Sequence, residues 1–435
     1  MIKVALWGYG KYGRRMFESL TLFCSDEYEV VRVYDRDYQK LKYTEGKTSL
    51  QIYNPEELLE DYKNGLFKKV LLCFLWYYEL EEPRKLLKKY SIPELHLGSE
   101  SDFYPASCFE QGTKPFYIPQ EGYSFYVFNN LYGAMANYES NELLYLFDHE
   151  GRVLQEHWSH WYGKVSPHVY DFPFVLKNSK VKKTYFKGQF CVLTKQAASN
   201  YWHFTYQCLD SVYLLEKAGY KGKYIVPNKI YCVELLHMLG IGSERIISLS
   251  TFEHNKIYIF EEVFYVAFSV GKEKYGTSVL LQAAEKIKKR LPVDPLLPKK
   301  IYVKRIGKRK LLEADDLLAE YGFTSVIPED YSVQEQMALF FNAEIVFCVH
   351  GANSTNCLYM RKNTVFIEAF SHKWIDEWNL YTLVAGQISY LPVSPLETVW
   401  INEDGISQDF TIPDILLRMT IQNAFLIREA QRETI

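Results

Sequence analysis

Residues 298–370 read PKKIYVKRIGKRKLLEADDLLAEYGFTSVIPEDYSVQEQMALFFNAEIVFCVHGANSTNCLYMRKNTVFIEAF, a stretch that alternates short apolar runs with longer amphipathic segments. The apolar runs have the length and the Val, Ile and Phe content of strands, and the segments between them have the length of helices. This alternation predicts a doubly wound parallel sheet. The predicted strands are 298–305, 323–329, 343–349 and 364–370, and the predicted helices are 310–322, 332–342 and 352–363.

Two local signals support the helix boundaries. Gly322 follows the first predicted helix, where a glycine commonly ends a helix. Ser332 is followed three residues later by Glu335, which is the pattern of a capping box. We therefore expect the second helix to begin directly after Ser332.

Residues 1–98 show the same alternation and predict a Rossmann-like domain at the N-terminus. Within it, Gly8, Gly10 and Gly13 lie between the first strand and the first helix, and Asp35 closes the next strand. This spacing matches the dinucleotide fingerprint, in which glycines let a pyrophosphate approach a helix N-terminus and the acidic residue binds a ribose. The pattern indicates a site for NAD.

The residues between these glycines support an alternative. Tyr9, Lys11 and Tyr12 are bulky at positions where a pyrophosphate would have to approach closely. In the alternative, the domain keeps the tight turn for packing and binds no dinucleotide.

The rest of the chain divides by composition. Residues 99–123 carry three prolines and no periodicity, which is typical of a linker. Residues 124–290 alternate strand and helix patterns again and predict a second, smaller α/β domain. Residues 291–412 hold the sheet that the opening stretch predicts, and residues 413–435 predict a closing amphipathic helix. The fold class is α/β.

Charge and cysteine content exclude several classes of protein. With 50 basic and 53 acidic side chains and a net charge of −3, the chain predicts no nucleic-acid-binding surface, so any anion site is local. The eight cysteines form no CxxC pair, which is typical of a reduced protein, and no Cys/His spacing suits zinc. No metal site is predicted.

The chain also shows no targeting segment. It opens on a strand-like run and has no apolar run of the ~18–20 residues that a spanning helix needs. We expect a cytoplasmic protein, and the sequence leaves open contact with the inner face of a membrane and assembly into homo-oligomers.

Two strand ends of the opening stretch carry the groups of an anion site. The first strand runs into the basic loop KRIGKRK with Arg305 and Arg309, and the third runs into His350, Gly351 and Ala352. Loops at the carboxyl ends of parallel strands meet at one edge of the sheet, where helix N–H groups and guanidinium groups bind phosphate well. Together they predict a diphosphate site, with Glu368 at the end of the next strand as an acceptor for ribose hydroxyls. Taken singly, each loop also fits a solvated basic loop or an ordinary capped helix.

The same stretch resembles glycosyltransferase family 61. The similar features are a strand that ends in a basic pair, a second Arg, a GF, a Ser-x-x-Glu-Gln helix start, HGA followed by Thr-Asn, and a strand with a closing Glu. Upstream, NYWHFTYQCLDSVYLLEKAG is similar to the family's Asn-x-x-His segment, so the resemblance covers roughly residues 190–370. Lys304, Lys308 and Ser354 depart from the family pattern, which has Arg, Arg and Leu at these positions.

The resemblance implies a GT-B enzyme with two facing Rossmann-like domains, preceded here by the third, N-terminal one. It implies an inverting reaction, no obligatory metal or other cofactor, and a nucleotide-diphosphate sugar as donor, for which we expect a UDP-sugar. The acceptor domain would be residues 124–290 and the donor domain residues 291–412. The predicted donor-binding residues are Arg305, Arg309, Gln336, His350, Gly351, Ala352, Ser354, Thr355, Asn356 and Glu368.

The reaction also needs a base that takes the acceptor proton. His203, near the start of a helix in the acceptor domain, is the candidate, and Asp210 lies two turns further along the same face. Two turns are too far apart for a hydrogen-bonded pair. A structural histidine, or Glu329 and Asp330 in the loop IPEDY, are the alternatives.

Three functions compete at this point. The first is a glycosyltransferase that extends a surface or capsular glycan on a glycan or lipid-linked acceptor. The second is an NAD-dependent oxidoreductase that uses the N-terminal fingerprint. The third is a non-catalytic scaffold that binds a nucleotide sugar.

Overall fold

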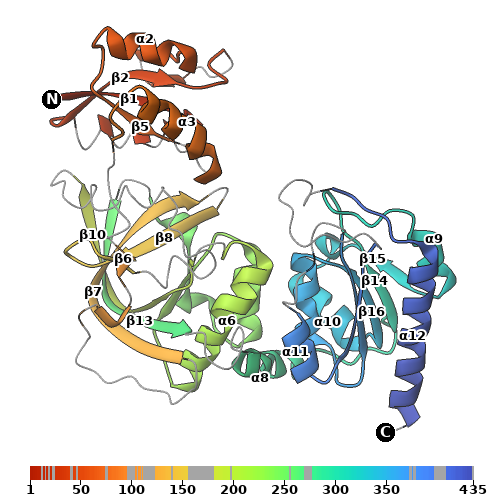
Figure 1. The fold of residues 1–435 in the computed structure, drawn as a ribbon. Helices are drawn as coiled ribbons and strands as arrows, with labels where there is room; N and C mark the ends of the chain where they lie inside the picture. Colours follow the sequence, from red (N-terminus) through yellow and green to blue (C-terminus); the bar gives the residue numbers. More distant parts are fainter. Residues whose placement is uncertain are drawn as a thin grey trace.

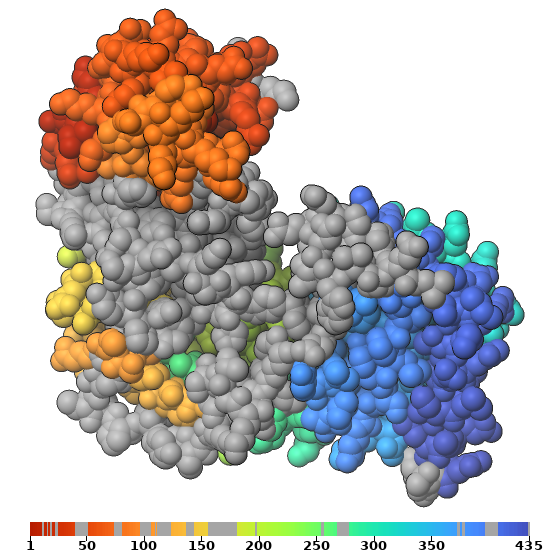
Figure 2. Space-filling model, viewed as in Figure 1, coloured from red at the N-terminus to blue at the C-terminus, as the bar shows by residue number. Residues whose placement is uncertain are grey.

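The computed structural model describes residues 1–10, 13–14, 16–17, 20–21, 25–39, 43–45, 48–73, 77–95, 103–104, 106–108, 110, 123–138, 141–154, 181–195, 198–253, 256–268, 277–371, 375, 379–395 and 408–433. These residues form three α/β units, each built on a sheet of its own (Figure 1). We call them the N-terminal, middle and C-terminal units. The N-terminal unit (red and orange) and the C-terminal unit (blue) form separate lobes in Figure 2.

The C-terminal unit contains five parallel strands in the order β15-β14-β16-β17-β18. Every residue of β16 and β17 is buried, as expected for parallel strands that are covered on both faces. The predicted parallel sheet is confirmed. The strands are β14 (Lys300–Val303), β15 (Thr324–Val326), β16 (Ile345–Val349), β17 (Val365–Ala369) and β18 (Ser389–Val393).

Helices cover both faces of this sheet. One face packs against α9 (Asp315–Glu320) and α12 (Asp414–Glu433), and the other against α10 (Val333–Asn342), η9 (Ala352–Tyr359) and α11 (Leu380–Ala385). The capping box predicted for α10 is confirmed, because the hydroxyl of Ser332 accepts the N–H of Glu335 and the carboxylate of Glu335 accepts the N–H of Ser332.

The helix predicted at 352–363 is different in kind. It is the 3₁₀-helix η9, and it ends at Tyr359. Both the amide and the hydroxyl of Ser354 donate to the carbonyl of Gly351, at 2.9 Å and 2.7 Å. A serine hydroxyl that competes for a backbone carbonyl in this way disfavours regular α-helix. The loop after β16 therefore runs into a tight turn.

The middle unit departs further from the predicted Rossmann-like domain. Its sheet has the order β12-β11-β10-β13-β7-β8-β9-β6, in which the strands from β12 to β13 and the edge pair β9-β6 are parallel. β13 pairs with β7 in the antiparallel direction, and β7 with β8. β7 and β13 are 16 and 13 residues long and rich in aromatic residues, which favour long strands. The strands are β6 (Phe103–Tyr104), β7 (Tyr123–Tyr138), β8 (Asn141–Phe147), β9 (Val153–Leu154), β10 (Lys182–Val192), β11 (Lys223–Val226), β12 (Ile246–Ser248) and β13 (Lys256–Phe268).

The middle and C-terminal units share one hydrophobic core. In the middle unit it includes residues of α6 (Tyr201–Lys217), α7 (Ile230–Met238) and α8 (Thr277–Lys288). Val333 and Met337 of α10 and Leu358 and Tyr359 of η9 belong to the same core. Figure 1 shows α6 and α8 on the side of the middle unit that faces the C-terminal unit. The start of α6 thus lies at the junction of the two units.

The N-terminal unit has three parallel strands in the order β2-β1-β5, with bounds β1 (Ile2–Trp7), β2 (Tyr28–Tyr34) and β5 (Lys69–Leu72). Side chains of β1 alternate between two cores. Ala5 and Trp7 pack with residues of α2 (Leu58–Lys63) and α3 (Tyr77–Lys89), while Val4 and Leu6 share a core with the middle sheet. The N-terminal unit is therefore docked on the middle unit.

The predicted linker and closing helix are both built into sheets or cores where they are described. Within 99–123, β6 pairs with β9 at the edge of the middle sheet, and residues 111–122 lie outside the described residues. α12 buries Leu417, Ile421 and Ala424 against the C-terminal sheet, so it belongs to that unit's core. Of the described helices, none has both the length and the apolar character to cross a bilayer.

Candidate functional site

The strand order of the C-terminal unit indicates where a ligand can bind. β14 lies between β15 and β16, so the chain reverses its direction of travel across the sheet between β14 and β16. Ligands of doubly wound sheets bind at this switch point, outside the carboxyl ends of the strands. The loops that leave β14 and β16 there are KRIGKRK and HGANSTN. They touch, because Nη1 of Arg305 donates to the carbonyl of His350 at 3.0 Å.

Arg305 is a partly buried cation at this point. Its Nε donates to the carbonyl of Lys308 at 2.7 Å, which folds the loop around the guanidinium group. In the described part of the chain no carboxylate lies within ion-pair distance of it. Burial lowers the pKa of the Arg305 guanidinium, partly offset by Cys348 and Glu329. A positive charge that is partly removed from water and lacks a carboxylate partner favours an anionic ligand.

The other cations of the loop are arranged differently. Lys304 pairs with Asp315 at 2.7 Å and Lys310 pairs with Asp409 at 3.3 Å, so both are neutralised within the protein. Arg309 adopts a positive φ of 62° and borders a small pocket at the ends of β16 and β17, which is too narrow in this structure to hold a water molecule. Arg305 therefore contacts the loop after β16, and Arg309 lies beside the ends of β16 and β17.

Gly351 makes the close approach of these loops possible. A Cβ atom at this position would lie 1.6 Å from Nη1 of Arg305. Its φ of 154° is also one that glycine adopts far more readily than other residues. Directly after it, the amides of Ala352 and Asn353 precede the first hydrogen bond of η9 and have no carbonyl within the helix to bind. Together, these N–H groups and Arg305 are suited to bind the oxygen atoms of one anionic group.

His350 is buried and held in one orientation. Its Nδ1 lies 2.8 Å from Oε1 of Glu368, and its ring stacks on Phe370 with centroids 4.8 Å apart. With an ionised carboxylate as partner, Nδ1 carries the proton. The side chain of His350 lines the same pocket as Arg309.

Glu368 does not have the environment of the predicted ribose acceptor. It is 1% exposed, and besides His350 it accepts hydrogen bonds from Asn379 at 2.9 Å and from the hydroxyl of Tyr390 at 3.0 Å. Donors of the protein already occupy both of its oxygens. Glu368 lies near the end of β17, as the sequence predicts, but its side chain is buried within the protein and orients His350.

Four other predicted donor-binding residues also have protein partners or lie in the core. Ser354 donates to Gly351 and accepts from Asn379, and Thr355 is fully buried. Asn356 accepts from the hydroxyl of Tyr201 at 2.7 Å and donates to Gln336, whose own amide donates to the carbonyl of Pro328. These side chains stabilise the loop after β16 through contacts within the protein, and they join this loop to the middle unit.

The two residues predicted for catalysis separate in the structure. His203 lies in the first turn of α6, beside Trp202, and this turn meets η9 where the hydroxyl of Tyr201 donates to Asn356. Asp210 is 3% exposed and accepts from the hydroxyl of Tyr123 at 2.8 Å and from the amide of Ser211. Asp210 therefore anchors β7 to α6 inside the middle unit, and its burial there is at odds with a catalytic role. His203 stays a prediction.

Ser371 is a candidate that the sequence analysis missed. It directly follows the end of the strand-like run TVFIEAF, and it lines the pocket together with Arg309 and His350, along with Val349, Ala369 and Phe410. It is 4% exposed, and its hydroxyl has no hydrogen-bond partner among the described residues. An unsatisfied buried hydroxyl costs about 1–3 kcal/mol. The strand-end position was the available signal.

The described residues of the N-terminal fingerprint contact other parts of the protein, while Lys11 and Tyr12 lie outside the described residues. A Cβ on Gly13 would lie 2.0 Å from the carbonyl oxygen of Gly8, so this glycine serves close packing of helix and strand. The amide of Tyr9 donates to Oδ2 of Asp35 at 2.5 Å, and the amide of Asp37 donates to Oδ1 at 2.8 Å. The ring of Tyr9 is buried in the core shared with the middle unit. Asp35 is engaged with backbone amides, and Gly10 has open space around it.

Within the described ranges, no three His, Cys, Asp or Glu side chains are grouped to hold a metal ion. Metal independence itself stays a prediction.

Comparison with known proteins bears on the middle and C-terminal units. A family model, Glycosyltransferase 61, matches residues 201–367. The match runs from the start of α6 into β17, so it includes Arg305 and Gly351 and excludes the N-terminal unit. No curated protein matches the chain. The resemblance seen in the sequence is confirmed for this segment: residues 201–367 form a glycosyltransferase family 61 domain.

Proposed function

We propose that the protein transfers a sugar from a nucleotide-diphosphate sugar to a glycan or lipid-linked glycan. The observation that carries the proposal is Arg305, a partly buried cation at the switch point that contacts the loop at Gly351 and has no carboxylate partner among the described residues. A diphosphate is the part of a nucleotide sugar that such a group recognises.

The chemistry assigned to these groups is stabilisation of the leaving diphosphate. The acceptor hydroxyl attacks the anomeric carbon, the bond from that carbon to the diphosphate oxygen breaks, and negative charge grows on the diphosphate. Arg305 and the first amides of η9 stabilise this charge, which is the largest single contribution in many enzymes of this kind. We propose direct, inverting displacement without a required metal. UDP is the proposed nucleotide.

The acceptor proton goes to His203 in this proposal. Its support is the position of the first turn of α6, where Tyr201 binds Asn356 of η9 and brings the middle unit to the edge of the donor loop. The middle and C-terminal units would then be the acceptor and donor sides of a GT-B-like enzyme.

The biological setting is a proposal of the same kind. We propose synthesis of a surface or capsular polysaccharide by a cytoplasmic protein at the inner face of a membrane. Among the described residues seven cysteines are free, which suits a reducing compartment.

A ligand panel tests the donor. Purified protein is titrated with UDP, GDP, CDP and NAD in a thermal-shift assay, because a ligand at 100 times its dissociation constant adds about 2.7 kcal/mol to the free energy of unfolding. We expect one nucleoside diphosphate to stabilise the protein, and Arg305→Ala to remove the effect while Lys310→Ala, whose lysine is paired with Asp409, keeps it.

The competing functions give other results. Stabilisation by NAD that is lost in Gly10→Val, with no response to diphosphates, would support the oxidoreductase. Diphosphate binding without sugar transfer to any of a range of glycan acceptors would support the scaffold.

A further inference from the structure

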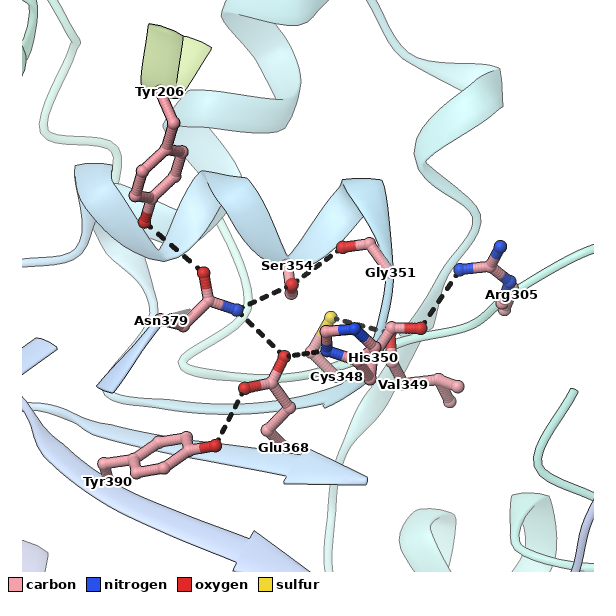
Figure 3. A network of polar contacts seen from close by, with 10 residues as sticks. All are labelled: Tyr206, Arg305, Cys348, Val349, His350, Gly351, Ser354, Glu368, Asn379 and Tyr390. Carbon is pink, nitrogen blue, oxygen red and sulfur yellow. Dashed lines mark hydrogen bonds and ion pairs between the residues drawn. The ribbon is translucent and has the colours of Figure 1, made fainter. Parts of the chain in front are cut away.

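A buried polar chain joins the acceptor-side helix α6 to the donor loop (Figure 3). The hydroxyl of Tyr206 lies 3.3 Å from Oδ1 of Asn379 and 3.2 Å from Oγ1 of Thr382, so it can donate to Asn379 while it accepts from Thr382. The amide of Asn379 donates to Glu368 at 2.9 Å and to Ser354 at 2.8 Å. Glu368 holds Nδ1 of His350, and Ser354 holds the carbonyl of Gly351. This network of hydrogen bonds therefore reaches both His350 and Gly351, the two residues that follow β16.

The members of this chain are deeply buried. None of Tyr206, Ser354, Glu368, Asn379 and His350 is more than 7% exposed. Buried polar groups are costly unless each finds a partner, and a network in which each does fixes one arrangement of its side chains. Hydrogen bonds from buried side chains, in addition to packing, thus fix the position of the donor loop after β16, residues 350–356.

Tyr206, the first residue of this network, belongs to a different unit from the other members. Asn379, Glu368, Ser354 and His350 all belong to the C-terminal unit, but Tyr206 belongs to α6 of the middle unit. α6 is also the helix whose first turn carries His203. Tyr206 lies about one turn after His203 on this helix, so the helix of the proposed base touches the network that orients His350.

We propose that Tyr206 and Glu368 are positioning residues: Glu368 orients His350 at the donor site, and Tyr206, acting through Asn379, ties that orientation to the acceptor-side helix. Neither residue is assigned contact with substrate. The inference rests on the proposed function for the identity of the ligand, a nucleoside diphosphate. It goes beyond that function because it makes the donor site depend on a residue of the other unit.

The test compares two hydroxyl deletions on one helix. Tyr206→Phe removes the donor to Asn379, and Tyr213→Phe removes a hydroxyl whose one hydrogen-bond partner among the described residues is Gln282, within the middle unit. Dissociation constants for UDP are measured by calorimetry on the full-length chain. We expect UDP binding to weaken about fivefold in Tyr206→Phe, as for loss of one hydrogen bond, and to change less than twofold in Tyr213→Phe. Equal effects of the two changes would overturn the proposal.

A double-mutant cycle tests whether Tyr206 acts through Glu368. Glu368→Gln is expected to weaken UDP binding at least tenfold, and adding Tyr206→Phe to it should weaken binding no further, because groups that act in one chain are non-additive. Fully additive losses would contradict the proposal. If Glu368→Gln does not fold, Asn379→Ala takes its place in the cycle.

A spectroscopic measurement separates this inference from the proposed function. The ring-nitrogen NMR signals of His350, identified by their loss in His350→Gln, report its tautomer in protein without ligand. We expect Nδ1–H in the unsubstituted protein and a shifted or averaged signal in Tyr206→Phe and Glu368→Gln, with no shift in Tyr213→Phe. If no nucleoside diphosphate binds but these shifts occur, the proposed function fails and the positioning network stands. An unchanged His350 signal in Tyr206→Phe removes the network.

Discussion

The N-terminal and C-terminal units both have a glycine-containing loop at the same point of similar sheets. They differ in whether the described residues already provide partners for the polar groups beside that loop. In both, the first strand lies between the second and a later one, as β2-β1-β5 and β15-β14-β16. In the N-terminal unit both oxygens of Asp35 accept backbone amides, and Tyr9 is buried beside the turn. In the C-terminal unit, the described residues provide no carboxylate partner for Arg305 and no hydrogen-bond partner for the buried hydroxyl of Ser371.

The difference teaches how such motifs should be interpreted. A glycine pattern reports where the backbone turns tightly, and that turn serves packing as well as binding. Whether it binds a ligand depends on charged and polar groups that the protein leaves unsatisfied. Beside the better-known fingerprint, Asp35 is engaged by backbone amides, whereas Arg305 in KRIGKRK has no carboxylate partner among the described residues.

The largest expected effect tests the C-terminal side of the comparison. Arg305→Ala should lower kcat/KM for sugar transfer by about a thousandfold, roughly 4 kcal/mol, because a charge on the leaving diphosphate loses its partner. Steady-state kinetics with the donor found in the ligand panel would measure it. Lys304→Ala, which removes a lysine paired with Asp315, is the control. Equal losses in both variants would show that Arg305 has no special role.

The next effect tests the N-terminal side. Gly13→Ala should lower the free energy of unfolding by about 3 kcal/mol, since its Cβ meets the backbone carbonyl of Gly8 and overpacking costs this much. Chemical denaturation measures it, and hydrogen exchange locates it in the N-terminal unit. Gly10→Ala is matched, because a Cβ there meets nothing within 4 Å. UDP affinity should be unchanged in both, and a loss of affinity in Gly13→Ala alone would tie the two units together functionally.

A smaller effect is expected at the donor loop's own glycine. Gly351→Ala should weaken UDP binding about thirtyfold, roughly 2 kcal/mol, because the new Cβ displaces the guanidinium group of Arg305. Gly307→Ala shares the positive φ but has open space, so it controls for backbone strain alone. Calorimetry on both variants distinguishes displacement from strain. If the two lose affinity equally, contact with Arg305 is not the reason for Gly351.

The smallest effect concerns Asp35. Asp35→Asn should lower the free energy of unfolding by about 1 kcal/mol, since one accepting oxygen is replaced by an amide that cannot accept from a backbone N–H. NAD should leave the melting temperature of the unsubstituted protein unchanged. A clear NAD-dependent shift that Asp35→Asn abolishes would reverse the comparison between the two units.

The sequence by itself determined the parallel sheet of the C-terminal unit and the ends of its strands. Continuous apolar runs such as IVFCV can be buried on both faces only in a covered sheet, and the capping pair Ser332 and Glu335 is a local signal. It did not predict β18, because Pro392 interrupts the run SYLPV; proline is tolerated at this edge of the sheet.

The tertiary structure alone decided which polar residues are available to a ligand. Glu368, Ser354 and Asn356 look like ligand-binding groups in the sequence, and the fold gives each of them protein partners. Those partners, among them Asn379, Tyr390 and Tyr201, are distant in the chain and have no signature of their own. Patterns along a chain report strand ends and turns, because these depend on neighbouring residues. Satisfaction of a buried charge depends on residues brought together by folding, and only the structure shows it.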